Sequence, residues 1–248
     1  LPLNRQAIPF MLDRAEIAAH ATAAEQVATL RTIERKAQAS ASRLRSIMDQ
    51  TGLDRGRFAK AMPKGDARET SGIGGPLLPM SGPDAAGFER SLAATQKFLR
   101  ETESLSRIVR ALPIHRPIGK GQETSSPFGG RIDPFTRGYA MHSGLDFRAS
   151  TGTPVKAAAD GKVVQADWTG GYGRLVEVDH GFGLTTRYAH LSGFEVAVGE
   201  TVRKGAVVGY VGSTGRSTGP HLHYEVRIDD EAVDPINFVR AGEKAGVD

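Results

Sequence analysis

The sequence predicts an α+β protein, in which a helical N-terminal region precedes a mostly antiparallel β domain. Composition changes sharply near Leu112: before it, Ala, Glu, Arg and Gln are common and favour helices. After Pro113, short segments of β-branched and alternating residues are separated by glycines, which is typical of strands joined by tight turns. We therefore expect two regions, residues 1–112 and residues 113–248.

The N-terminal region is predicted to contain two helices folded back on each other, or a longer coiled coil with a partner. The first helix would begin near Asp13, because Asp13 and Glu16 resemble a capping box. The second would begin at Asp84, a residue type that caps helices well. Apolar residues recur at helical spacings in both segments. They are Leu30, Ile33, Ala37, Leu44 and Ile47 in the first, and Phe88, Leu92, Leu99, Leu105, Ile108 and Leu112 in the second.

A Gly- and Pro-rich loop near residues 63–83 separates the two helical segments. Its apolar part, Ile73–Met80, is unusual for a solvated loop, and it would either pack against the helices or cover a peptide groove. The helical region contains none of the candidate site residues described below, so we expect it to dock another protein or to shield the site rather than to contribute chemistry. The pattern leaves open whether the chain forms a homo-oligomer.

Charge and composition limit the classes of function. The net charge of +4 and the pI near 9.4 suit an anionic polymer, either cell wall or nucleic acid. Nucleic acid has no support beyond this charge, and no GxGxxG motif or P-loop follows a predicted strand, so we expect no nucleic-acid partner. No apolar run reaches the roughly 20 residues that cross a bilayer. With no cysteine in the chain, any zinc must be held by histidines and carboxylates.

Four of the seven histidines fall into three short motifs: His142-Ser-Gly-Leu-Asp146, Tyr188-Ala-His190 and His221-Leu-His223. Residues i and i+4 share a face of a strand or a helix, and residues i and i+2 share a face of a strand. A catalytic zinc needs three protein ligands and an open position for water. His142, Asp146 and one histidine of the His221/His223 pair would supply three ligands. The remaining histidine and His190 would be free for acid–base work.

The second region resembles the lysostaphin/LytM-type zinc endopeptidases, which hydrolyse peptidoglycan. The resemblance covers roughly residues 113–240 and rests on motifs in the same order along the domain. These are Ser125-Ser-Pro-Phe-Gly129, Arg131-Ile-Asp-Pro134, His142-Ser-Gly-Leu-Asp146, Gly152-Thr-Pro-Val155, Gly161-Lys-Val163, Tyr188-Ala-His-Leu191, Gly209-Tyr-Val-Gly-Ser-Thr-Gly215 and Ser217-Thr-Gly-Pro-His-Leu-His-Tyr-Glu225.

The resemblance implies a LytM-like peptidase domain with zinc bound by His142, Asp146 and His223. It makes His190 and His221 the catalytic pair, with their individual roles left open. Tyr188 could hydrogen-bond the tetrahedral intermediate or contact substrate, although an aromatic residue on a strand is an equal alternative. The expected activity is hydrolysis of peptide cross-links in peptidoglycan by metal-activated water.

The resemblance also bears on location and on other functions. The first residues lack Met and a signal-peptide pattern, so we expect that an export or anchor segment has been removed and that the protein acts in the periplasm or cell envelope. Some members of the family activate amidases after losing ligands, but all five site positions are present here. A lipoyl- or biotinyl-type carrier, suggested by Val202–Gly209, would need neither HxxxD nor HxH.

Overall fold

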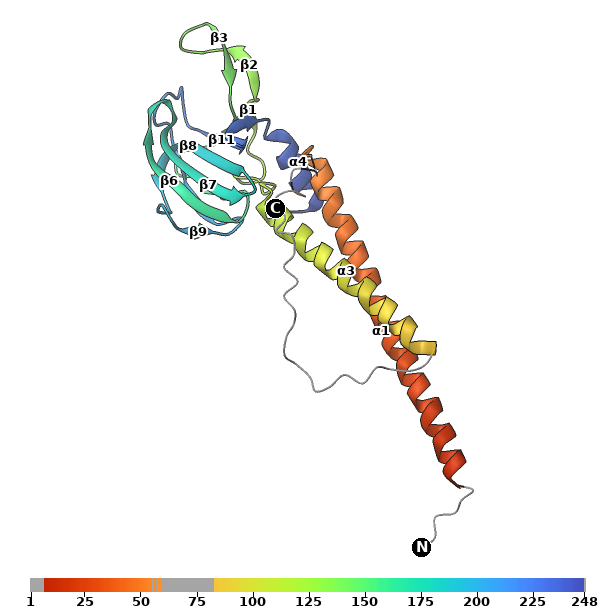
Figure 1. Ribbon diagram of the computed structural model, residues 1–248. Coiled ribbons are helices and arrows are strands. Elements are labelled where there is room, and N and C mark those ends of the chain that lie inside the picture. Colours follow the sequence, from red (N-terminus) through yellow and green to blue (C-terminus); the bar gives the residue numbers. More distant parts are fainter. Residues whose placement is uncertain (1–6, 55, 57, 59–82, 248) are drawn as a thin grey trace. The chain divides into compact units, whose positions relative to one another are not determined.

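A computed structural model of the chain describes residues 7–54, 56, 58 and 83–247 (Figure 1). The chain divides into two compact units, Leu1–Arg45 with Met62–Leu105, and Ser46–Ala61 with Ser106–Asp248. The domain boundary between residues 112 and 113 stays a prediction. Most of the Gly/Pro-rich loop, including Ile73–Met80, lies outside the described residues. None of the described helices has the length and apolar character needed to cross a membrane.

The first unit contains α1 (Ala7–Gln50) and α3 (Pro83–Ala111), apart from the C-terminal ends of both helices, which belong to the second unit. Helix α1 begins at Ala7, so Asp13 lies inside the helix and the predicted capping box is wrong. Pro9 does not prevent this earlier start, because the backbone N–H groups of a first helical turn have no partner within the helix.

Small and polar residues line the contact between the two helices. The hydroxyl of Thr102 donates a hydrogen bond to the carbonyl of Ala37 at 3.1 Å, and Thr95 reaches the carbonyl of Leu30 at 3.4 Å. Two residues of the predicted apolar stripes are instead exposed, Ile33 by 38% and Leu99 by 47%. Five other residues of the predicted stripes are buried, which confirms most of the expected apolar side: Ala37, Ile47, Leu105, Ile108 and Leu112.

The second unit is built on an antiparallel sheet of ten strands within the described residues, which confirms the predicted α+β class. Seven strands follow one another in the order β1-β4-β11-β8-β7-β6-β9, while β10 pairs with β5 and β8, and β12 pairs with β11. The strands are β1 (Thr124–Ser126), β4 (Leu145–Arg148), β5 (Pro154–Lys156), β6 (Gly161–Thr169), β7 (Gly173–Gly181), β8 (Leu184–Phe194), β9 (Thr201–Val202), β10 (Val207–Val211), β11 (His221–Ile228) and β12 (Glu231–Val233).

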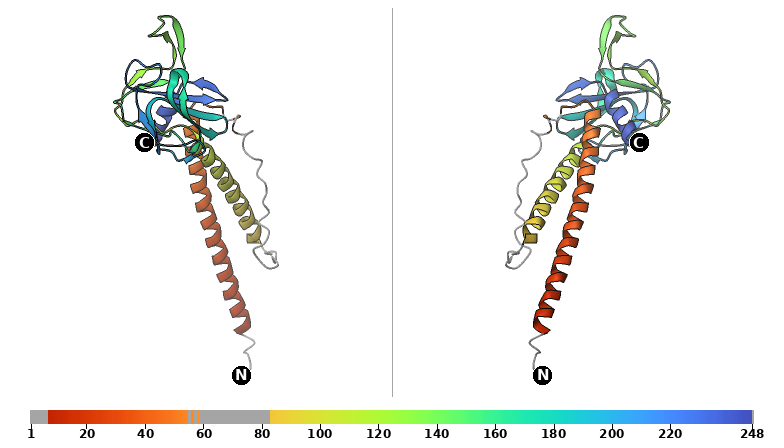
Figure 2. Two further views of the ribbon diagram at one scale, coloured as in Figure 1. Left: turned by 90° about the vertical axis from the view of Figure 1, so that its left-hand side faces the viewer. Right: turned by 90° about the vertical axis from the view of Figure 1, so that its right-hand side faces the viewer.

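Three further elements complete this unit. Strands β2 (Gly129–Ile132) and β3 (Tyr139–His142) form a separate hairpin that projects from the sheet (Figures 1 and 2). A 3₁₀ turn, η1 (Gly170–Tyr172), joins β6 to β7, and helix α4 (Ile236–Ala245) follows β12. The hairpin, η1 and the loop between β10 and β11 are the elements that surround the candidate site.

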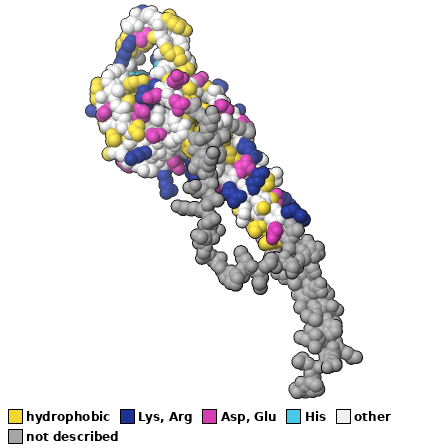
Figure 3. Space-filling view, viewed as in Figure 1, with side chains coloured by type: hydrophobic (Ala, Val, Ile, Leu, Met, Phe, Trp, Pro, Cys, Tyr) yellow, Lys and Arg dark blue, Asp and Glu magenta, His cyan; other side chains and the backbone are white. Residues whose placement is uncertain are grey.

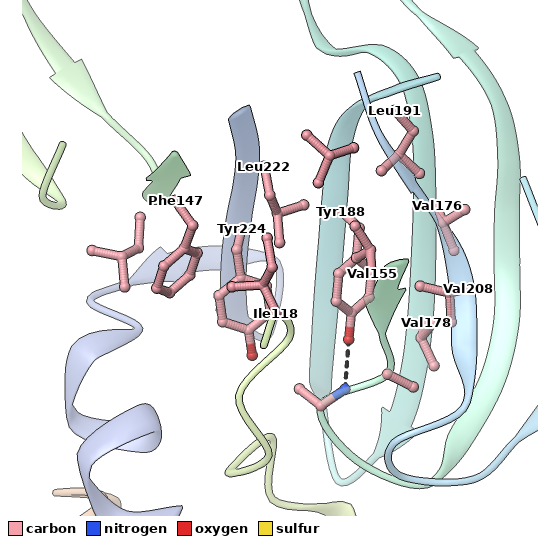
Figure 4. Close-up of a cluster of buried hydrophobic side chains, with 14 of the residues drawn as sticks. Ile118, Phe147, Val155, Val176, Val178, Tyr188, Leu191, Val208, Leu222 and Tyr224 are labelled. Carbon is pink, nitrogen blue, oxygen red and sulfur yellow. Dashed lines mark hydrogen bonds between the residues drawn. The ribbon is translucent and has the colours of Figure 1, made fainter. Parts of the chain in front are cut away.

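The core fills one face of the sheet, and the candidate site lies on the other (Figure 4). Leu222 and Tyr224 of β11 and Phe147 of β4 are fully buried among the valines of β7 and β10. Because successive side chains of a strand point to opposite faces, the intervening His221 and His223 point away from this core. Alternate residues of β11 therefore either pack in the core or face the candidate site.

A buried polar chain borders the core at His180. Nδ1 of His180 donates to the carbonyl of Asp160 at 2.8 Å, and Nε2 lies 2.8 Å from the hydroxyl of Thr186. That hydroxyl is also hydrogen-bonded to the hydroxyl of Tyr188, at 2.9 Å. Burial lowers the pKa of His180 to about 4, so the ring is neutral when the protein is folded at neutral pH.

We expect His180 to make folding stability depend on pH. The unfolded ring titrates near the ordinary value of 6.5 and the folded ring near 4, so the unfolded chain binds more protons between these values. The contribution of neutral His180 to the free energy of unfolding is therefore fully present above about pH 6.5. Roughly 1–3 kcal/mol of it is lost as the pH falls toward 4. Urea denaturation of metal-free wild type and His180→Asn across this range should show a flatter profile for the variant. Parallel profiles would contradict this assignment, because all other groups titrate in both proteins.

Candidate active site

The three predicted ligands, His142, Asp146 and His223, converge on one point. They come from the end of β3, from β4 and from β11, and each is less than 10% exposed. Nε2 of His142 lies 3.1 Å from Oδ1 of Asp146 and 3.2 Å from Nδ1 of His223, and the last two atoms are 2.8 Å apart. Ligand atoms about 2.0–2.1 Å from a tetrahedral zinc lie roughly 3.3 Å from each other. The three atoms are therefore close enough together to bind one metal ion.

The HxxxD motif reaches this point through a turn rather than along one strand. His142 ends β3 in the hairpin, Asp146 belongs to β4 of the large sheet, and Ser143 and Gly144 connect them. Glycine is required here, because a Cβ on Gly144 would lie 2.6 Å from the carbonyl oxygen of Tyr224 and 2.7 Å from Cε1 of His223. The expectation that one strand or helix face presents both side chains is wrong.

Hydrogen bonds on the far side of each ring determine which nitrogen faces the cluster. Nδ1 of His142 donates to the carbonyl of Pro127 at 2.7 Å, so Nε2 faces the cluster. Nε2 of His223 donates to Glu225 at 3.1 Å, and its Nδ1 faces the cluster, 2.8 Å from Oδ1 of Asp146. Burial opposes the charge on His223, but its hydrogen bonds to Asp146 and Glu225 raise its pKa to about 9, so a metal bound here would displace the proton from Nδ1.

Glu225 is a completely buried carboxylate held by several donors. Besides His223, it accepts hydrogen bonds from Ser143, from the hydroxyl of Tyr172 at 2.9 Å and from Arg227 at 2.7 Å. Burial opposes its charge, but the hydrogen bonds from His223 and Ser143 outweigh burial and lower its pKa to about 2. Glu225 therefore holds the His223 ring from the side opposite the cluster.

Replacing Glu225 with glutamine should weaken metal binding by about 10- to 100-fold, because the amide keeps the shape but removes the charge that orients and polarises His223. Competition with a chromogenic chelator, with zinc as the probe, measures the dissociation constant directly. Glu195→Gln, which changes an exposed carboxylate paired with Tyr210, is the matched control. Equal affinities of the Glu225 variant and the wild type would show that the hydrogen bond does not support the site.

The other two histidines of the motifs lie beside the cluster with their Nε2 atoms free. Nδ1 of His190 donates to the carbonyl of Thr214, and Nδ1 of His221 donates to that of Gly219, each at 2.8 Å. The two rings are 4.8 Å apart at their centroids, and Nε2 of His221 lies 3.9 Å from Oδ1 of Asp146. Burial, with the nearby His221 and His223, lowers the pKa of His190 to about 4, so its ring can accept a proton at neutral pH.

His190 reaches this position because β8 is irregular. Its φ is +60°, a left-handed value that is uncommon for a residue other than glycine and costs of the order of 1–3 kcal/mol. Ala189 and His190 together oppose the single residue Leu175 of β7, where the register shifts between Tyr188 and Leu191. This bulge breaks the alternation, so that Tyr188 and His190 point to opposite sides of the sheet.

Tyr188 therefore does not contact the site, and its predicted role toward an oxyanion or a substrate is wrong. The side chain is fully buried in the core, and its hydroxyl accepts a hydrogen bond from the backbone N–H of Ala158 at 2.8 Å (Figure 4). Tyr172 of η1, which the sequence did not single out, lies beside the cluster instead, with its ring 5.8 Å from that of His223. No motif spacing identified Tyr172, because a 3₁₀ turn brings it there.

Two hollows flank the cluster. One, of about 310 Å³, lies between the β2–β3 hairpin and η1 and is lined by Met141, Tyr172, His190 and Arg216 among others. The other, of about 800 Å³, is lined by Arg131, Asp146, Arg148, Thr218 and His221 together with small polar residues. Arg131 borders both. An extended peptide could thus lie across the cluster with one part in each hollow.

The hairpin beside the first hollow carries exposed hydrophobic side chains (Figure 3). Tyr139 is 84% exposed and pairs across the hairpin with Ile132. Arg216, from the loop between β10 and β11, forms an ion pair with Asp133 at 2.5 Å and lies over the ring of Phe135 at 4.7 Å. These contacts join the hairpin to the loop across the hollow.

An antiparallel sheet, two histidines and one aspartate whose ligand atoms converge, and two further histidines beside them form a site of the kind that metal-dependent hydrolases use. Residues 140–235 match the model of "Peptidase family M23". These residues therefore form a peptidase family M23 domain, and the resemblance seen in the sequence is confirmed.

Named relatives agree with this family. The chain is 52% identical over 113 residues to "DD-carboxypeptidase/endopeptidase Mpg" of Neisseria meningitidis, a match that covers 46% of this chain and 26% of the relative. It is 36% identical over 146 residues to "Peptidoglycan DD-endopeptidase ShyA" of Vibrio cholerae, covering 59% and 33%. The catalytic domain of lysostaphin from Staphylococcus simulans aligns at 35% identity with a TM-score of 0.45, covering 48% of this chain and 92% of that domain. The chain thus spans about a quarter to a third of the curated relatives' length.

Proposed function

We propose that the chain is a zinc-dependent endopeptidase that hydrolyses peptide cross-links of bacterial peptidoglycan. The observation that supports this most directly is the pair of free Nε2 atoms, on His190 and His221, beside a three-atom ligand set. Relatives named as peptidoglycan DD-endopeptidase and lysostaphin support the choice of substrate. The hydrolysis adds water across one amide: the C–N bond breaks, the carbonyl carbon becomes a carboxylate, and the nitrogen leaves as an amine.

His142, Asp146 and His223 would hold the metal, and their borderline nitrogen and oxygen donors suit zinc. When bound, zinc supplies a water of lowered pKa and polarises the scissile carbonyl. The chain itself contributes the acid–base groups: Nε2 of a neutral imidazole accepts the proton from water, and an imidazolium donates a proton to the leaving amine. The carbonyls of Thr214 and Gly219 keep these rings in the tautomer that turns Nε2 toward the reaction.

Digestion of purified peptidoglycan, followed by mass analysis of the released fragments, tests this function. We expect fragments with new amino and carboxyl ends in the peptide bridges and intact glycan strands, and no such release after zinc is removed with a chelator. A protein that binds one zinc per chain and releases no fragment would contradict the proposal and favour an activator of other wall enzymes.

A peptidoglycan hydrolase meets its substrate outside the cytoplasmic membrane, so the proposed location is the periplasm or cell envelope. The helical unit supplies none of the five site residues, and its proposed role is to dock an envelope or divisome protein or to restrain access to the groove.

A further inference from the structure

Arg148 is an arginine on the site face of the sheet for which the proposed reaction gives no role. It ends β4, and it lies two residues after Asp146, so the two side chains share a face while Phe147 between them is buried in the core. In the register of β4 and β11, Arg148 is the direct partner of His221, as Asp146 is of His223. Side chains of such partners begin about 4.5–5.5 Å apart. Arg148 is therefore the immediate neighbour of a proposed catalytic histidine.

The surroundings of Arg148 leave its charge available to a ligand. Its side chain is exposed, and among the described residues no carboxylate forms an ion pair with it. Arg131, on the other side of the same hollow, is already 3.6 Å from the carboxylate of Asp146. Glu123 also lines this hollow, and the hydrogen bond between the two residues joins their backbones: the N–H of Arg148 donates to the carbonyl of Glu123. Most of the remaining wall consists of uncharged serine, threonine, glycine and proline residues.

We infer that Arg148 is a specificity-determining residue that binds a carboxylate on the amine side of the scissile bond. This inference rests on the proposed function and names the substrate class within it: cross-links whose amine-donating residue carries a free carboxylate. A guanidinium presents two parallel N–H donors that match the two oxygens of a carboxylate. A glycine bridge has no carboxylate at this position.

The chemistry of a D-Ala–diaminopimelate cross-link fits this position. The carbon that bears the cross-linked nitrogen of diaminopimelate also bears a carboxylate, so the carboxylate lies one carbon away from the bond that breaks. A carboxylate held by Arg148 would place the leaving nitrogen on the His221 side of the cluster, because Arg148 and His221 are cross-strand partners. The same contact would therefore select the substrate and determine its direction across the two hollows.

Two matched substrates test the inference: a cross-linked peptidoglycan dimer with this carboxylate free, and the same dimer with it converted to a carboxamide. We expect the zinc-loaded wild type to favour the free carboxylate by about 10- to 100-fold in kcat/KM, as for a charge-assisted hydrogen bond at a partly exposed site. Arg148→Gln should bring this ratio close to 1 by slowing only the carboxylate substrate, and Arg148→Lys should restore part of it. Arg203→Gln, an exposed arginine outside both hollows, should keep the wild-type ratio.

The possible failures are distinguishable. If the wild type cleaves both dimers equally well, or if Arg148→Gln slows both by the same factor while its zinc content and melting temperature stay unchanged, the inference is wrong and the proposed function stands. If the wild type cleaves neither dimer nor intact wall, the proposed function fails and the inference fails with it. If Arg148→Gln does not fold, Arg148→Met takes its place, and a wild-type ratio in that uncharged variant would overturn the inference.

Discussion

Alanine in place of His142, Asp146 or His223 should remove the bound metal and reduce hydrolysis of peptidoglycan by roughly 1,000-fold or more. Each supplies one of only three ligand atoms, and metal assistance is worth several kcal/mol in the transition state. Elemental analysis of each purified variant gives the zinc content, which we expect near one per chain for the wild type and far lower for the three variants.

His115→Ala is the matched control for this series, because His115 bonds the carbonyl of Val247 and lies outside the cluster. It should keep both zinc and activity. Full zinc in all three ligand variants would show that the metal is held elsewhere, and the assignment would be wrong.

Alanine in place of His190 or His221 should lower activity without removing the metal. Zinc content should stay near one per chain, while turnover falls by about 10²- to 10⁴-fold, because both rings lie beside the ligand set and only their acid–base function is lost. The double variant should lose less than the product of the two single effects, as residues that act on one reaction are not independent. Near wild-type turnover in either single variant would exclude that histidine from catalysis.

The sequence motifs contain the four histidines and one aspartate that the structure brings together. The expected side-chain geometry, however, was correct for only one motif. Period two correctly placed His221 and His223 on one face, because β11 is a regular strand whose alternate residues fill the core. It failed at Tyr188 and His190, because a bulge with a left-handed residue cannot be read from the pattern of polar and apolar residues. Tyr188, which was expected at the site, consequently lies in the core.

The helices show a different limit of the pattern. Ile33 and Leu99 satisfied the expected apolar spacing but are exposed, whereas Thr95 and Thr102 face the partner helix. Ala37, Leu105 and Ile108 of the same stripes are buried as expected, so the period predicted the buried side of the helices but not the threonines that share it.

Most hydrogen-bond partners that orient the imidazole rings could not be predicted from the sequence. Glu225 could be found, because it shares a strand face with His223. The carbonyls of Pro127, Thr214 and Gly219 could not, because every residue has a carbonyl and only the folded backbone brings these three to the rings.

These far-side hydrogen bonds also bear on how the protein responds to metal supply. Each imidazole of the site is oriented by a partner that exists without any ion, so the rotational freedom of the rings is lost when the chain folds and not when metal arrives. Zinc should then leave and return without unfolding the domain, unlike in small domains that fold only around their metal. For the zinc enzyme proposed above, scarcity of zinc would stop hydrolysis reversibly, and a later supply would restore the same molecules to activity.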